Sequence, residues 1–412
     1  MAKKQICIVI GASHGGVNFA FNLRKKGWKG EIILYDAESV FPYQKPPLSK
    51  SYLINGNLEH NFIKPPEAFK KENIFLELGK VVSSINKINK TIILENGTIR
   101  SYDKLVIATG ARPLIPTKLR IDYSNNNVFT LRTAEDVMNI KNTLQTSKEK
   151  RVLIIGGGYI GLEIAASLVK LDASITVLER ERRVLSRVTV PVMSKYFTKL
   201  HQEHGVKILT KMNVTSIKSK ANYSTILCND GSSFDADVVI LGLGIIINLE
   251  LAKQANLDVD NGIKVNKFVQ TTNEDIYAIG DCSNHFNPHY QQNIRLESIQ
   301  NAIDQGKVAA AHICGENIIY DTIPWFWSDQ YDIKLQIVGL SNGFDEVLVR
   351  KENKVQKSFS IWYFKGKELL AVDAINNPKA YVLGTKFIRE KTLISKDILM
   401  DKTIPLKSLI VQ

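Results

Sequence analysis

The sequence predicts an α/β fold with two Rossmann-like units and a smaller α+β unit at its C-terminal end. Two stretches, QICIVIGASHGGVNFAFNL (5–23) and RVLIIGGGYIGLEIAASL (151–168), each predict a buried strand, a glycine-rich turn and a helix. In both halves a similar pattern follows, at 91–110 and 225–244: an Asn-Gly or Asp-Gly hairpin and then an apolar strand ending in glycine. From residue 320 on, alternating aromatic and polar segments indicate antiparallel strands.

The first unit opens with an apolar run at 6–10. The run is short for a signal peptide and no cleavage site follows it, so we expect a buried strand in a cytoplasmic chain. A helix up to about Lys26 and the strand EIILY come next, with Asp36 at the end of that strand. The second unit repeats this plan, with a helix up to about Leu171 and the strand SITVLE ending at Glu179.

The two units are not expected to be in tandem. After the second unit, another strand ends in the sequence IYAIGD (276–281), and RLESIQNAIDQGKVAAAHICG (295–315) predicts a closing helix. The simplest arrangement is an insertion of the second unit into the first. The predicted domains are therefore 1–112 with 245–319, then 113–244, then 320–412.

Composition limits the function classes. The 412 residues carry a net charge of +13, with 54 Lys and Arg against 41 Asp and Glu. The basic clusters are short and no nucleic-acid-binding motif accompanies them, so we expect solvated faces and no nucleic acid partner. No apolar run has the roughly 20 residues of a membrane-spanning helix. The four cysteines (7, 228, 282 and 314) form no C-x-x-C motif, which argues against a zinc site, an iron–sulfur cluster or a redox-active disulfide; four buried thiols are expected.

The second glycine turn matches G-x-G-x-x-G at Gly156, Gly158 and Gly161. Glycine lets a pyrophosphate approach the backbone and the start of the helix closely. Glu179 stands where an acid accepts a hydrogen bond from an adenine ribose 2′-hydroxyl, which favours NADH over NADPH. Three neighbouring arginines, in the sequence RERR (180–183), weaken that preference.

The first glycine turn is less regular, because Ser13 replaces the middle glycine after Gly11. His14 is expected to be a solvent-facing loop residue. Asp281, at the tip of a strand over the same sheet, suits the ribityl chain of FAD, which NAD lacks. The two sites therefore suggest FAD in the first unit and NADH in the second, with a hydride passing between them.

Three further features have two interpretations each. Lys50 is either an ordinary loop lysine or a cation beside the flavin, and Glu163 is either a helix-start acid or part of the site. The WFW sequence (325–327) either shields a flavin or anchors the core of the third unit.

Seven motifs together resemble the NADH-dependent ferredoxin reductases of oxygenase systems: FPYQKPPLSK, YDKLVIATGARP, LRTAEDV, VLIIGGGYIGLE, IYAIGDC, RLESIQNA and PWFWSDQYDIKLQIVGL. The resemblance implies a glutathione-reductase-like fold, one non-covalent FAD and NADH as donor. It implies that electrons pass to an acidic [2Fe–2S] ferredoxin, which serves a haem-thiolate monooxygenase or a Rieske dioxygenase. The chain would act as a monomer or weak homodimer. The chain is also similar to rubredoxin reductases and to apoptosis-inducing-factor flavoproteins, which remain alternatives.

The same resemblance implies site residues but no metal site. The pair Lys50 and Glu163 would be catalytic, beside the flavin. FAD contacts are implied for Gly11, Ser13, His14, Gly15, Asp36, Lys50, Val82, Ala108, Arg132, Asp281, Glu297, Ile299 and Trp327. NAD contacts are implied for Gly156, Gly158, Tyr159, Ile160, Gly161, Glu179 and Gly244.

Two positions depart from the family pattern, and two lysines are docking candidates. Glu38 lies close to Asp36, so which carboxylate meets the ribose of FAD stays open; Ile247 stands where the family usually has proline. The positive surface suits an acidic ferredoxin, and Lys307 and Lys334 are candidates for contacting it.

Overall fold

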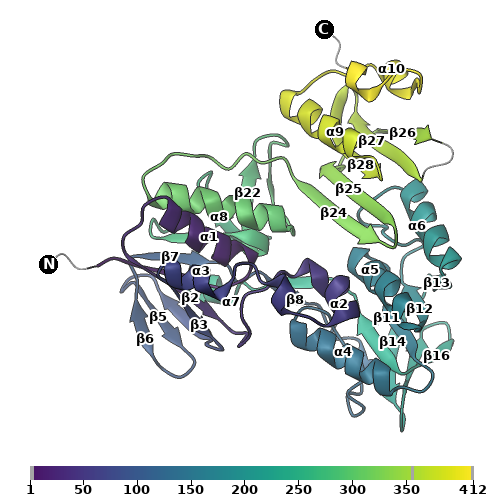
Figure 1. The fold of residues 1–412 in the computed structure, drawn as a ribbon, viewed down its shortest axis with the longest axis horizontal. Helices are drawn as coiled ribbons and strands as arrows, with labels where there is room; N and C mark the ends of the chain where they lie inside the picture. Colours follow the sequence, from purple (N-terminus) through teal and green to yellow (C-terminus); the bar gives the residue numbers. More distant parts are fainter. Residues whose placement is uncertain (1–3, 354–356, 410–412) are drawn as a thin grey trace.

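The computed structural model describes residues 4–353 and 357–409, and it has two nucleotide-binding-like lobes with the C-terminal unit above the second (Figure 1). In the first lobe, a five-stranded parallel sheet has the order β21-β7-β1-β2-β3. Its strands are β21 (Ile276–Ala278), β7 (Lys104–Ile107), β1 (Ile6–Ile10), β2 (Glu31–Asp36) and β3 (Ile74–Leu78).

Each face of this first sheet is covered by a different layer. Helices α1 (His14–Lys25) and α8 (Ile299–Ile313) lie side by side (Figure 1) and pack on Cys7 and Val9. The alternate residues Ile8 and Ile10 pack against a small antiparallel sheet of β4 (Val82–Asn86), β5 (Thr91–Leu94) and β6 (Ile99–Ser101). This alternation explains why the strand is apolar throughout: it is buried on both faces.

The second lobe repeats the architecture. Its parallel sheet has the order β10-β17-β11-β12-β13. Strands β17, β11, β12 and β13 thus take the places that β7, β1, β2 and β3 have in the first lobe. The bounds are β10 (Val128–Phe129), β17 (Val238–Leu241), β11 (Arg151–Ile155), β12 (Ser174–Glu179) and β13 (Lys207–Thr210). The helices of this lobe are α4 (Ala134–Thr146), α5 (Tyr159–Leu168) and α6 (Pro191–Glu203). A second small sheet is formed by β9 (Arg120–Ile121), β14 (Val214–Ser219), β15 (Ser224–Cys228) and β16 (Ser233–Ala236).

Helix α5 is shorter than predicted. It ends at Leu168, and a 3-10 turn (Val169–Leu171) carries the chain to Asp172, which has a left-handed backbone with φ of 58°. The predicted end near Leu171 thus includes this tighter turn, a common way for a helix to finish.

Two short strands connect the lobes. Strand β8 (Ala111–Pro113) pairs antiparallel with β18 (Ile245–Ile247), where the chain leaves the first lobe and where it returns. Ile247 pairs with Ala111 in this ladder, so the residue that replaces the family's proline forms a regular strand. The returning chain forms α7 (Glu250–Gln254), β19 (Val259–Asp260), β20 (Gly262–Val265), β22 (Ser283–Asn287) and β23 (Gln292–Ile294).

The C-terminal unit is a five-stranded antiparallel sheet of order β24-β25-β28-β27-β26. Its strands are β24 (Trp325–Gln330), β25 (Ile333–Gly339), β26 (Glu346–Asn353), β27 (Ser358–Lys365) and β28 (Glu368–Ile375). Helices α9 (Pro378–Glu390) and α10 (Lys396–Met400) lie beside the sheet (Figure 1), and Phe387 and Leu399 share an apolar core with Trp362. Other strand residues, including Leu335 and Ile361, join the core of the second lobe. The predicted antiparallel strands are therefore confirmed, but the expectation that they are half-exposed was wrong for β27 and β28, which are buried on both faces because the sheet packs against both the helices and the second lobe.

Two short helices, α2 (Ser51–Asn55) and α3 (Pro66–Lys71), follow β2 in the chain. In Figure 1, α2 lies beside α4, away from the sheet of the first lobe. Among the described residues, no helix has the length and apolar character needed to cross a membrane.

Candidate functional site

A cavity lies where the two lobes and β24 meet. It is bounded by the start of α1, the 45–50 segment, the start of α5, and residues 279–281. The cavity lining consists of Ser13, His14, Gly15, Lys45, Pro46, Leu48, Ser49, Lys50, Ala108, Gly110, Leu131, Arg132, Tyr159, Ile160, Glu163, Ile279, Gly280, Asp281, Glu297, Ser298, Ile299, Ala302, Phe326 and Trp327. Since the first residues of α1 and of α5 line one cavity, ligands bound at the two helix starts would meet inside it.

The two glycine turns have the same backbone geometry. Gly11 and Gly156 adopt φ of 108° and 114°, a region that strongly favours glycine. A Cβ on Gly16 would lie 1.9 Å from the carbonyl oxygen of Gly11, and one on Gly161 would lie 2.2 Å from that of Gly156. The third glycine of each turn is thus required for the helix to pack against the turn.

The acids at the ends of β2 and β12 also occupy equivalent places. Asp36 accepts hydrogen bonds from the backbone N–H of Ala12 (2.5 Å) and of Glu38 (2.9 Å). Glu179 accepts from the N–H of Gly157 (2.7 Å) and of Glu181 (2.8 Å). In both lobes the carboxylate therefore stands beside the glycine turn, where the ribose of a bound dinucleotide is recognised.

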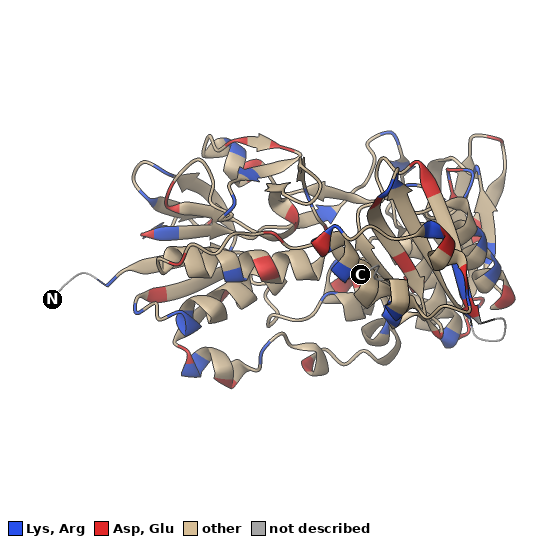
Figure 2. Ribbon diagram, turned by 90° about the horizontal axis from the view of Figure 1, so that it is seen from above, with Lys and Arg blue, Asp and Glu red and all other residues tan. Residues whose placement is uncertain are grey.

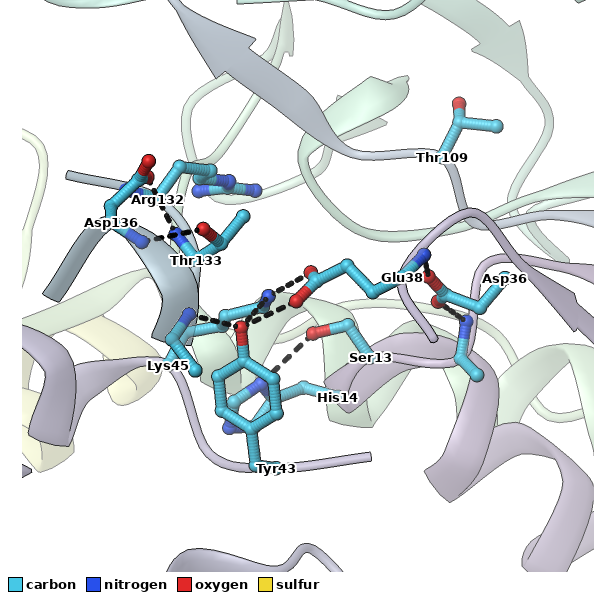
Figure 3. Close-up of polar contacts among 12 residues, drawn as sticks. Ser13, His14, Asp36, Glu38, Tyr43, Lys45, Thr109, Arg132, Thr133 and Asp136 are labelled. Carbon is cyan, nitrogen blue, oxygen red and sulfur yellow. Dashed lines mark hydrogen bonds and ion pairs between the residues drawn. The ribbon is translucent and has the colours of Figure 1, made fainter. Parts of the chain in front are cut away.

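Glu38 is engaged elsewhere. Its carboxylate forms an ion pair with Lys45 and accepts a hydrogen bond from the Tyr43 hydroxyl at 2.6 Å, and Tyr43 in turn accepts from the N–H of Ala134 at 2.9 Å (Figure 3). This cluster fastens the proline-containing 41–50 segment to the start of α4. The geometry favours Asp36 over Glu38 as the equivalent of Glu179.

Helices α1 and α5 begin at the cavity without side-chain caps. Neither Ser13 nor Gly158, the residues before the first helical turn, forms a side-chain cap hydrogen bond. The first backbone N–H groups of each helix can therefore receive an anion, and the helix dipole adds to the attraction.

The prediction that His14 is a solvent-facing loop residue was wrong. His14 is the first residue of α1, is 8% exposed and lines the cavity. Burial, with the positive charges of Lys45 and Arg132, lowers its pKa to about 4, so the imidazole is neutral at physiological pH.

The expectation of four buried thiols was wrong for Cys314. Its thiol is only half-buried, while the other three are buried.

Lys50 and Glu163 form an ion pair at the cavity. The Lys50 ammonium lies 2.6 Å from Glu163 Oε2, which also accepts a hydrogen bond from the Ser49 hydroxyl at 2.6 Å. Glu163 is 4% exposed, and its other oxygen accepts from the Ser328 hydroxyl at 2.7 Å. Lys50 is thus not a free loop lysine and Glu163 is not a solvated helix-start acid. The pair joins the first lobe to the second.

Asp281 and Arg132 also line the cavity, and the Arg132 guanidinium lies 3.9 Å from the Asp281 carboxylate. Burial raises the pKa of Asp281 to about 6, against the opposing effect of Arg132. Arg132 is held by the start of α4, where its N–H donates to Asp136 and Thr133 forms a capping box with the same aspartate (Figure 3).

Aromatic side chains line part of the cavity. Tyr159 and Phe326 have ring centroids 4.9 Å apart, and both belong to the lining together with Trp327. Trp325 instead packs against Trp327 and Tyr381 of the C-terminal unit. Trp325 thus anchors the core of the third unit, as one interpretation predicted, whereas Trp327 lines the cavity and its contact with a flavin stays a prediction.

The predicted site residues divide into two groups. Thirteen positions named from the sequence line the cavity: Ser13, His14, Gly15, Lys50, Ala108, Arg132, Tyr159, Ile160, Glu163, Asp281, Glu297, Ile299 and Trp327. Outside its lining lie Gly11, Asp36, Val82, Gly156, Gly158, Gly161, Glu179 and Gly244. Val82 follows two residues after Lys80, whose backbone N–H donates a hydrogen bond to the Asp36 carbonyl at 2.9 Å. The chain at Val82 is therefore close to the end of β2.

Several lining residues were not selected from the sequence. Lys45 and Ser49 belong to the FPYQKPPLSK motif, and Phe326 lies inside the WFW sequence. Gly16, which lies outside the lining, was not chosen either, although its place five residues after Gly11 identifies it as the third glycine of the turn.

Comparisons with known proteins agree with this geometry. The family model described as pyridine nucleotide-disulphide oxidoreductase matches residues 5–306, and the model described as reductase C-terminal matches 325–410. The chain belongs to the pyridine nucleotide-disulphide oxidoreductase family. It is an oxidoreductase, and its family and relatives imply the use of FAD and NAD(H).

Individual relatives cover almost the entire chain. Putidaredoxin reductase from Pseudomonas putida is 40% identical over 98% of this chain and 96% of its own length. A rubredoxin-NAD(+) reductase from the same organism is 36% identical over 90% of this chain and 96% of its own length. The crystal structure of the covalent putidaredoxin reductase–putidaredoxin complex matches with a TM-score of 0.92 and 39% identity, covering 98% of both chains. The glutathione-reductase-like architecture that the resemblance implied is in agreement with these matches.

The residues present fit FAD. The first glycine turn has no room for side chains at Gly11 and Gly16, the start of α1 is uncapped, and Lys45 and Arg132 supply positive charge for a pyrophosphate. The family name includes a disulphide, but all four cysteines of this chain are free thiols, and none of them lines the cavity.

Proposed function

We propose that this chain is an FAD-dependent NADH:ferredoxin reductase that passes electrons to an acidic [2Fe–2S] ferredoxin of an oxygenase system. One observation carries the proposal: the starts of α1 and α5, each following a dinucleotide-type glycine turn, line the same cavity. Two nucleotides bound at these turns would have their reactive ends side by side. Bound FAD would supply hydride acceptance and single-electron release, the chemistry that protein side chains lack.

Each part of the chain has a proposed role. Residues 1–112 and 245–319 form the FAD-binding domain, because β21 completes the sheet of β1 and β7. Residues 113–244 form the NAD-binding domain, and 320–412 close the cavity through β24. The uncapped start of α1 and Asp36 would hold the pyrophosphate and ribose of FAD, and the start of α5 and Glu179 those of NADH.

Lys50 and Glu163 are proposed to act at the flavin edge of the cavity. The ammonium of Lys50 can donate toward an electron-rich ring, and Glu163 orients that ammonium. Asp281, facing Arg132, would receive hydrogen bonds from the ribityl hydroxyls. Tyr159 and Trp327, which line the cavity, would cover the bound nucleotides and exclude water from them.

The acceptor is proposed from charge. With a net charge of +13, the chain should attract an acidic ferredoxin at long range, and the attraction should weaken with salt. Lysines and arginines are spread among acidic residues in both lobes (Figure 2), so the docking face is not marked by a single basic cluster. A cytoplasmic location is part of the proposal and follows from the reducing environment that free thiols suit.

Anaerobic stopped-flow absorbance tests the proposal. The purified holoenzyme is reduced with NADH and then mixed with an oxidised [2Fe–2S] ferredoxin, while the flavin band is followed. Rapid bleaching and rapid recovery are expected. Bleaching without recovery would reject this acceptor, and rubredoxin is then tried in its place. A failure of NADH to bleach the flavin would reject the reductase function itself.

A further inference from the structure

The Glu163 carboxylate ends a line of hydrogen bonds that runs away from the cavity into the protein interior. Ser328 donates to Glu163 Oε1 at 2.7 Å, and Gln330 Nε2 lies 3.1 Å from the Ser328 hydroxyl. The Gln330 oxygen lies 2.8 Å from His201 Nε2, and the Tyr331 hydroxyl lies 3.0 Å from His201 Nδ1. The three central residues are buried, with exposed fractions of 0% for Ser328, 1% for Gln330 and 0% for His201.

The charge on Glu163 fixes the direction of every bond in this line. A carboxylate only accepts hydrogen bonds, so the Ser328 proton points to Glu163 and its oxygen must accept from the Gln330 amide. The Gln330 carbonyl oxygen then faces His201, which must donate from Nε2. Burial lowers the pKa of His201 to about 4, so its ring is neutral and Nδ1 is left to accept from Tyr331. All the donors thus point toward one carboxylate.

The members come from separate parts of the chain. Glu163 lies on α5, Ser328 and Gln330 on β24, and His201 on α6. The surroundings are apolar, since Phe197 and Leu200 of the same helix and Ile333 and Leu335 of the sheet all belong to the buried core. Apolar side chains at these three positions would fill such a core equally well. Burying polar side chains here costs free energy of folding unless all their hydrogen bonds are made. We therefore explain the presence of these polar residues by their effect on Glu163.

We propose that Ser328, Gln330 and His201 are positioning residues, whose hydrogen bonds hold the Glu163 carboxylate in the orientation that directs Lys50 into the cavity. The effect on flavin reduction rests on the proposed function, whereas the orientation of the bonds does not. Ser49 and Lys50 approach Glu163 Oε2 from the first lobe, and the line occupies Oε1. Without the line, the carboxylate is free to rotate and Lys50 loses a fixed partner.

The tautomer of His201 tests the direction of the bonds without any turnover. Holoenzyme labelled with ¹⁵N-histidine is studied by two-bond ¹H–¹⁵N NMR, and the His201→Gln variant assigns the resonance by its loss. The proton is expected on Nε2. A proton on Nδ1 would contradict the proposed direction and overturn the proposal, whatever the electron acceptor proves to be.

Ser328→Ala tests the positioning role against a matched variant, Ser360→Ala. Ser360 is also buried in the C-terminal sheet, where it accepts a hydrogen bond from Trp362 Nε1 at 2.9 Å, but it has no link to Glu163. Both variants should lose thermal stability. Ser328→Ala alone should slow flavin reduction by NADH, on the order of tenfold, and shift the reduction potential of bound FAD, because a hydrogen bond to a charged group is lost.

Two results decide this comparison. Equal effects of the two variants on reduction rate and potential would show that the line is merely structural. If Ser328→Ala does not fold, Gln330→Met removes the next link with a side chain of similar volume and is judged by the same potential measurement. These measurements involve only NADH and bound FAD. They therefore test the positioning role even if the protein proves unable to reduce a ferredoxin.

Discussion

Replacement of Asp373 by asparagine should make the protein more stable at neutral pH. Asp373 lies on β28, is 2% exposed, and accepts hydrogen bonds at one oxygen, Oδ2, from Thr189 (2.8 Å) and Tyr363 (2.6 Å). In Asp373→Asn the amide oxygen can take the place of Oδ2 and keep both bonds. The substitution therefore removes the charge while leaving the contacts with the second lobe in place.

The magnitude follows from the pKa. Burial raises the pKa of Asp373 from 3.8 to about 6. Between these values the unfolded chain has released the proton and the folded chain has kept it, so the free energy of unfolding falls as the pH rises. The loss is about 1.4 kcal/mol per pH unit and about 3 kcal/mol in all, and it is complete above pH 6. The asparagine variant does not titrate and keeps that stability.

Urea unfolding at pH 4.5 and pH 7.5 measures this effect. Tryptophan fluorescence is a suitable probe, because Trp325, Trp327 and Trp362 lie in the C-terminal unit beside the site of substitution. The stability advantage of Asp373→Asn over the natural chain should grow by about 2 kcal/mol between the two pH values. An advantage that is the same at both would show that Asp373 does not titrate in this range, and the reasoning from burial would fail.

Four further predictions concern the two nucleotide sites and the docking face. Gly16→Ala should yield protein without bound FAD, because a Cβ there lies 1.9 Å from a backbone oxygen; the flavin absorbance per chain measures this. In contrast, Gly158→Ala has no atom within 4 Å of the added Cβ, so the variant should keep FAD and fold normally, while the steady-state KM for NADH rises on the order of tenfold because the methyl group obstructs the pyrophosphate. Glu179→Gln should narrow the preference for NADH over NADPH by roughly tenfold in kcat/KM, since a carboxylate repels a 2′-phosphate; an unchanged ratio would assign the preference to other residues. Lys307→Glu should raise the KM for ferredoxin several-fold at low salt and leave NADH reduction of the flavin unchanged, and an unchanged KM would remove this lysine from the docking face.

The lobes were predictable because local signals agree with one another there. An apolar strand, a glycine at positive φ and an acid at the end of the next strand each indicate the same supersecondary unit, and they occur twice in the same order. Gly11 with Asp36 and Gly156 with Glu179 therefore identified two turns that the structure shows to be alike.

The position of His14 was mispredicted for a reason that the sequence contains. Serine is among the preferred residues before a helix, so Ser13 indicates that the helix begins at position 14. The first residue of a helix at the end of a parallel strand faces the crevice at the edge of the sheet, not the solvent. The prediction did not use this capping signal.

The Ser328–Gln330–His201 line was beyond sequence reasoning. Ser328 and Gln330 alternate along β24, and a polar alternation ordinarily marks the solvent-facing side of an antiparallel strand. Only the packing of α5 and α6 against β24 buries that side. A tertiary contact between separate units decides which face of the strand is inside, and no local pattern reports it.

The two glycine turns are alike in backbone but differ in what covers them. At the first turn, α8 lies against α1, and a Cβ added to Gly306 would be 3.2 Å from the carbonyl oxygen of Gly15. At the second, the space around Gly158 is open and Ile160 is 51% exposed. We therefore expect a ligand at the first turn to be more enclosed, by α1 and α8, than a ligand at the second turn, which would exchange more easily with the folded protein. This asymmetry is what a resident FAD and an exchanging NADH require, and it supports the assignment of one nucleotide to each turn independently of the acids that follow them.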